Sequence, residues 1–368
     1  MHVLELGFPG AKAAVGAVSR RWPLLLRRMS TCKSAGDGQC RKMNKSGLTK
    51  NSPISNTTFF ALLAFIFLVT FVFSFILAPF HVEGDQVHYV HAYEAMAGLG
   101  IIDAFNKYQS IIFTAEPFHF FIIWLFSNLG VEKNLLMAFA NALLAVLFAK
   151  YLRLKGSGFL LLIWIVFSTY YLHAMFFTLE RTKFAFIFLL FFLLTFHRWW
   201  IFLAVLTHSM LLIPVALVAI GKKLFTVHQH AHNKLTKKYT YYLYNLLYAV
   251  VIIFIFFQIL GIHLQYKFFA YFSKDASLGV FDLLPIVIFG AATFMTCKDK
   301  KNVLFFYSSL LVLSILLGGT RIDLIGFFGY LYFSNFSHQV FKFSIFVFGV
   351  YFLYLSWMYI LNIYHYGG

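Results

Sequence analysis

Long apolar runs are the feature of this sequence that most constrains its fold. A helix needs roughly 17–25 residues to cross a hydrocarbon layer of about 30 Å. Seven runs come close to or reach that length, at 59–79, 158–177, 199–220, 240–262, 280–297, 302–318 and 340–363, and shorter ones lie at 117–130, 134–149, 183–197 and 322–335. Because the runs are continuous rather than alternating, they indicate helices and not a barrel. We expect an all-α polytopic membrane protein, a bundle of about 10–11 transmembrane helices with some short or re-entrant segments.

The composition excludes the main soluble classes. Hydrophobic residues make up 61% of the chain and charged residues 12%, about half the roughly 25% of an ordinary soluble domain. So few charges cannot cover a water-soluble globule of this length, which excludes a soluble enzyme, a secreted disulfide scaffold and a disordered chain. The sequence therefore predicts a membrane location.

The amino-terminal segment differs from the rest. Residues 1–50 hold ten of the 30 Lys and Arg residues, against only Glu5 and Asp37. We interpret residues 1–55 as a basic cytoplasmic tail beside anionic lipid; nucleic-acid binding is disfavoured because no recognition motif accompanies the charge. For residues 1–42 three explanations stay open: a targeting extension, a true tail, or non-native sequence upstream of a start at Met43, which we favour. Residues 56–368 are expected to form the transmembrane domain.

The loops indicate an orientation for parts of this domain. The segments 221–239 and 298–301 are rich in lysine, whereas 80–116 is acidic. Positive loops stay in the cytoplasm, so 80–116 is expected to be an external acidic segment. The orientation of 117–220 stays open, because the short runs leave the number of crossings undecided.

A few ionisable residues interrupt the apolar sequence. A charge at the centre of a bilayer costs at least about 2.5–3.5 kcal/mol, so such residues suggest function or internal pairing. The candidates are Asp85, Glu116, Arg181, His208 and Arg321. Each also has a structural explanation. Asp85 would be a solvated loop residue, Glu116 the start of a helix, and Arg181 part of an interfacial pair with Glu180. His208 would be a neutral core imidazole and Arg321 a helix cap.

Taken in order, these residues resemble a known family, the EpsG-like or Wzy-type polysaccharide (O-antigen) polymerases. The matching motifs run from the first apolar run to the last third of the chain: Gly84-Asp85 followed by Tyr89 and Tyr93, Glu116-Pro117, Arg181, Thr207-His208-Ser209, and Gly318-Gly319-Thr320-Arg321. The resemblance covers residues 57–335.

The resemblance implies polymerisation of polyprenyl-diphosphate-linked oligosaccharides at the outer face of the bacterial cytoplasmic (inner) membrane. Arg181 and Arg321 would bind the leaving diphosphate, since the planar guanidinium forms bidentate bonds with phosphate. Asp85 or Glu116 would serve as the catalytic base, with His208 as a second candidate. No paired acidic motif suggests a metal-bound nucleotide sugar, so a metal-independent, cofactor-free glycosyltransferase is expected. Its partners would be membrane lipid, a chain-length regulator and a flippase, and no nucleic acid.

Other functions stay open. A flippase or transporter of lipid-linked sugars would usually show related halves, and no internal repeat is found. An O-antigen ligase would share the diphosphate-binding arginines. An acyltransferase would use a His-Asp or other histidine-centred motif to activate a hydroxyl, and that motif is absent as a tight pair.

Overall fold

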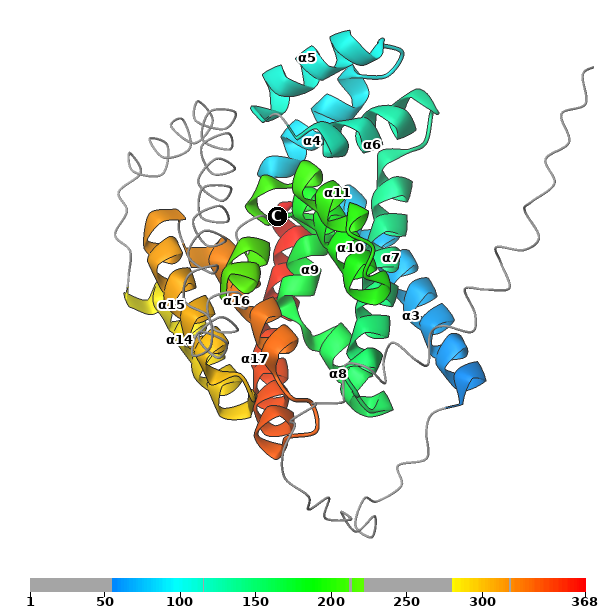
Figure 1. Cartoon of the computed structure of the whole chain (residues 1–368). Helices are drawn as coiled ribbons and strands as arrows, with labels where there is room; N and C mark the ends of the chain where they lie inside the picture. Colours follow the sequence, from blue (N-terminus) through cyan, green and yellow to red (C-terminus); the bar gives the residue numbers. More distant parts are fainter. Residues whose placement is uncertain (1–54, 115, 212–213, 222–279, 318) are drawn as a thin grey trace, which may run out of the picture. The chain divides into compact units, whose positions relative to one another are not determined.

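The computed structural model describes residues 55–114, 116–211, 214–221, 280–317 and 319–368, without the side chains of 280–282 and 315–321. All regular elements within these ranges are helical (Figure 1). They are α3 (Asn56–Leu77), η1 (Ala78–Phe80), α4 (Asp85–Ala95), α5 (Ile101–Ile112), α6 (Pro117–Asn128), α7 (Lys133–Leu154), α8 (Phe159–Ser168), α9 (Tyr170–Phe177), α10 (Glu180–Thr195), α11 (Trp199–Thr207), η2 (Ser209–Leu211), α14 (Val280–Thr296), α15 (Lys300–Leu317), α16 (Gly319–Phe333) and α17 (Gln339–Tyr366).

Most helices of the described residues are apolar, as expected for an all-α membrane protein. Three are long and apolar enough to cross a membrane: Asn56–Phe80, Lys133–Leu154 and Gln339–Tyr366. The number rises to five if the bent pairs α5–α6 and α8–α9 each count as one span. Shorter apolar helices cover Ser209–Gly221, Leu283–Thr296 and Ile322–Phe333. The predicted run 240–262 lies outside the described residues.

Two runs expected to be continuous helices are broken. The run 158–177 bends by 50° between α8 and α9, and Thr169 between them has an extended backbone. The run 199–220 is interrupted after Thr207, where His208 is extended. In both places a threonine hydroxyl donates to the carbonyl four residues earlier, Thr169 to Ile165 and Thr207 to Leu203. Such bonds compete with the backbone pattern of a helix and often bend it.

The polar segment 80–116, which we expected to be a loop between spans, contains helices. It contains α4 and α5, and α5 meets α6 at an angle of 114°. Gly84, with φ of 61°, precedes α4, a left-handed conformation that glycine adopts at no steric cost. Pro117 opens α6, a position where proline's missing N–H removes no helical bond.

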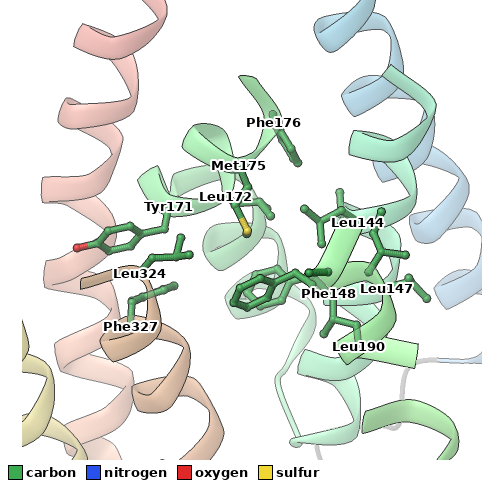
Figure 2. Close-up of a cluster of buried hydrophobic side chains, with 14 of the residues drawn as sticks. Leu144, Leu147, Phe148, Tyr171, Leu172, Met175, Phe176, Leu190, Leu324 and Phe327 are labelled. Atoms are coloured by element: carbon green, nitrogen blue, oxygen red, sulfur yellow. The ribbon is translucent and has the colours of Figure 1, made fainter. Parts of the chain in front are cut away.

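The core lies where helices distant in sequence pack together. α3 packs along α7, and α10 packs against α7 and α11. A second group consists of α14 packed against α15, α16 and α17. Figure 2 shows buried side chains from α7, α9, α10 and α16 gathered in one cluster, among them Phe148, Met175, Leu190 and Phe327. This packing places the ends of α6, α10 and α11 close together.

Candidate functional site

Three of the predicted site residues lie at helix ends. Glu116 immediately precedes α6, Arg181 is the second residue of α10, and His208 follows the last residue of α11. α11 contacts both α6 and α10. The three side chains therefore come from three separate elements that meet at their ends.

These three side chains form one hydrogen-bonded cluster. Nη1 of Arg181 donates to Oε2 of Glu116 at 2.8 Å. Nδ1 of His208 lies 2.7 Å from Oε1 of the same carboxylate. All three residues are buried, with 5–8% of their surface exposed (Glu116 6%, Arg181 8%, His208 5%). Glu116 thus joins a guanidinium and an imidazole at a site largely shielded from solvent.

Tyr89 is a further member of this cluster. Nε of Arg181 donates to the Tyr89 hydroxyl at 2.7 Å. Burial raises the pKa of Tyr89 above its usual value, and the positive charge of Arg181 only partly offsets this effect. The hydroxyl is therefore protonated at neutral pH. The sequence placed Tyr89 in a family motif without a role; here it fixes the orientation of the guanidinium.

A second buried ionic cluster lies beside the first. Oε2 of Glu180 is 3.1 Å from Nζ of Lys133, and Oε1 is 3.6 Å from Nε2 of His119. Nδ1 of His119 contacts the Tyr108 hydroxyl at 3.0 Å. The two clusters are linked through the chain, because Glu180 precedes Arg181 and His119 follows Glu116 by one helical turn on α6. Glu180 and Arg181 thus have separate partners and do not form the interfacial pair considered from the sequence.

Polar side chains also bind the carbonyl groups at the end of α9. The last carbonyls of a helix have no partner within it, and an unsatisfied one in an apolar environment costs several kcal/mol. The Phe176 carbonyl accepts from Lys183 at 2.9 Å and Asn141 at 3.1 Å. The Phe177 carbonyl accepts from Gln86 at 2.5 Å. These bonds stabilise the break before α10 and so position Glu180 and Arg181.

The other two predicted residues are not part of this cluster as the structure describes it. Asp85 is the exposed first residue of α4, one turn before Tyr89, and has no hydrogen bond or ion pair with the cluster residues described above. Arg321 belongs to α16, but its side chain lies outside the described residues. Lys133 and His119 were not selected from the sequence. His119 did carry a signal, since it stands three residues after Glu116, on the same face of a helix.

The chemistry available to the first cluster is proton transfer next to a positive charge. Because the Glu116 carboxylate accepts a bond from Nδ1 of His208, the proton of the neutral ring resides on Nδ1 and Nε2 is the basic nitrogen. A carboxylate that orients a histidine in this way is the arrangement used for hydroxyl activation in triads.

Across the described ranges, no three His, Cys, Asp or Glu side chains are grouped as metal ligands. No protein-family model, curated protein or solved structure matches the chain.

Proposed function

We propose that this chain is a metal-independent membrane glycosyltransferase. It would polymerise polyprenyl-diphosphate-linked oligosaccharide repeat units into O-antigen or exopolysaccharide at the outer face of the bacterial cytoplasmic membrane. The observation that supports this proposal best is the buried cluster of Glu116, Arg181 and His208. It combines a base for a hydroxyl with a cation for a diphosphate. The expected bundle of about 10–11 spans belongs to the same proposal.

The proposed roles follow from the contacts. Both oxygens of Glu116 already bind donors, so Glu116 acts as a positioning residue for His208 and Arg181. His208 removes the proton from the acceptor hydroxyl as its oxygen attacks the anomeric carbon. The bond from that carbon to the diphosphate breaks at the same time, which inverts the anomeric centre. Arg181, together with Arg321, stabilises the charge that develops on the departing diphosphate.

Asp85 has a separate place in this proposal. Its exposed carboxylate at the start of α4 makes it an alternative base on the external side. The Asp85→Asn and His208→Gln variants distinguish the two bases, because only loss of the true base lowers the rate of chain growth by about 10²–10⁴-fold.

The experiment is complementation of a deletion strain, read from its lipopolysaccharide ladder. We expect wild type to restore long chains and Glu116→Gln, Arg181→Gln and His208→Gln to leave a single capped repeat unit. Matched exposed controls, Asp103→Asn, Arg198→Gln and His197→Gln, should restore the ladder. Absence of any attached unit would identify a ligase, and precursor retained inside the cell would identify a flippase. Long chains from all three cluster variants would reject the proposal.

One observation favours a second candidate, a membrane acyltransferase. His208 and Glu116 are 92 residues apart in the sequence, yet they lie 2.7 Å apart in space. An acyltransferase would use this pair to activate a sugar hydroxyl towards an acyl donor. The deletion strain would then keep its chain lengths, and mass spectrometry would find each repeat unit lighter by one acyl group. The partners expected of a polymerase, a chain-length regulator and a flippase, would not be required.

A further inference from the structure

A cavity lies between candidate membrane-spanning helices, apart from the site described above. Its volume is about 190 Å³, and its walls come from α3, α8, α9 and α17. α3 and α17 are each long and apolar enough to cross a membrane, and α8–α9 is one of the bent pairs. None of the lining residues belongs to the cluster of Glu116, Arg181, His208 and Tyr89. The cavity therefore does not depend on the function proposed for that cluster.

The mouth of the cavity is apolar and exposed. Leu353 and Trp357 line it from α17, and their exposed fractions are 48% and 60%. Most of the α17 and α3 surface is likewise unburied within the described residues. On a helix that crosses a membrane, such a surface faces lipid hydrocarbon. A hydrocarbon chain can therefore enter from the bilayer.

The interior of the cavity adds polar atoms to these apolar walls. Nδ1 of His173 lies 3.0 Å from Oγ of Ser356, which fixes the imidazole ring. Thr70 also lines the cavity, and all three residues are at least nine-tenths buried (His173 7%, Ser356 2% and Thr70 3% exposed). Thr70, His173 and Ser356 are thus polar side chains in a lining that is otherwise apolar or aromatic.

A buried polar group in a mostly apolar wall is normally hydrogen-bonded, and a ligand that enters the cavity can supply such a bond. A cavity of this kind, with one fixed imidazole and one hydroxyl, offers both a donor and an acceptor to a ligand. The remaining lining side chains are aliphatic or aromatic. The matching ligand is a molecule with a single hydroxyl on an apolar chain.

The volume agrees with a short stretch of such a chain. An engineered apolar cavity of about 150 Å³ in another protein binds benzene. The present cavity is somewhat larger, so the hydroxyl-bearing end of a chain fits inside while the rest extends through the mouth. We propose that this cavity binds the hydroxyl end of a single-chain amphiphile, with the His173–Ser356 pair and Thr70 holding the hydroxyl.

The experiment is photolabelling of the purified full chain in detergent with a diazirine-bearing octanol. We expect labels on the peptides that contain residues 166–176 and 353–360, and competition by unlabelled octanol. Ser356→Phe, which fills the cavity, should lower that labelling at least tenfold. Val350→Phe places the same side chain at an exposed position of α17 and should leave the labelling unchanged.

The role of the hydroxyl is tested separately with His173→Phe, which keeps a ring of similar size. Wild type should label more strongly with the octanol probe than with a diazirine-bearing octane, and His173→Phe should remove this preference. This variant tests the site even if Ser356→Phe does not fold. Labelling spread over the exposed faces of α3 and α17, or equal labelling by both probes in wild type, would overturn the proposal.

Discussion

Oε1 of Glu116 lies 2.7 Å from Nδ1 of His208, although 92 residues separate them in the chain. The contact requires that α6 begins where α11 ends, since Glu116 precedes the first residue of α6 and His208 follows the last residue of α11. In a single straight helix over 199–220, His208 would lie inside the helix. In the structure it lies just after the end of α11, with an extended backbone. The break after Thr207 therefore creates the contact.

The ion pair between Glu116 and Arg181 should be strongly coupled. Removing one partner leaves a buried charge alone, which typically costs about 3–5 kcal/mol of stability. We expect Glu116→Gln and Arg181→Met to lower the free energy of unfolding by amounts of that order, and the double variant to lose less than their sum. The measurement is unfolding in mixed micelles by added SDS. Asp103→Asn is the exposed control, and strictly additive losses would contradict the pairing.

How far this site could be predicted depends on where each residue stands in the sequence. Glu116, Arg181 and His208 could be selected because each interrupts or borders an apolar run, where an ionisable residue is rare. Lys133 could not, because it follows Glu132 at the start of a run and has the appearance of a solvated boundary residue. Its burial depends on Glu180 and Gln86, and only the tertiary fold brings those residues to it.

Lys133 should stabilise the protein by compensating Glu180. Glu180 is 1% exposed, and Nζ of Lys133 lies 3.1 Å from its carboxylate. We expect Lys133→Met to lower the free energy of unfolding by about 3 kcal/mol, because the buried carboxylate loses its closest cation. Lys133→Met combined with Glu180→Gln should restore part of the loss. Thermal melting measures both, with Lys107→Met as the exposed control; a Lys133→Met variant as stable as wild type would show that the pair is not stabilising.

The helices themselves were easier to predict than their interruptions. Apolar runs predicted α3, α7 and α17 because hydrophobic length alone identifies a helix that can span a membrane. The break at Thr169 has no such signal, since neither glycine nor proline stands there and the competing bond is made by a threonine hydroxyl. α4 and α5 were missed because their polar sequence was read as a connecting segment.

The contact between α8 and α17 requires glycine at position 349. A Cβ built at Gly349 would lie 2.2 Å from Nε1 of Trp164 and 2.5 Å from its Cε2. We expect Gly349→Ala to destabilise the protein by about 1–3 kcal/mol, the usual cost of overpacking. Gly158→Ala, where a Cβ meets nothing within 4 Å, is the matched control. Adding Trp164→Leu to Gly349→Ala should recover stability; equal melting temperatures for the two alanine variants would contradict the close approach.

His81 should make stability depend on pH. Burial lowers the pKa of His81 to about 4, and the positive charges of Lys133 and Lys183 act in the same direction. The unfolded chain takes up this proton as the pH falls through about 6.5, whereas the folded chain does so only near pH 4. The stabilisation is therefore fully present above about pH 6.5 and is lost as the pH falls towards 4.

Between pH 7 and pH 5 we expect this single group to account for a loss of about 1 kcal/mol, after allowance for solvent screening. His81→Phe keeps a ring next to Phe177 and should show a correspondingly shallower dependence of the melting temperature on pH. His197→Gln, an exposed histidine, should retain the wild-type slope. Carboxylates titrate in every variant, so the variants are compared by the slope of melting temperature against pH over the same pH range. Identical slopes for wild type and His81→Phe would show that the fold does not hold His81 neutral.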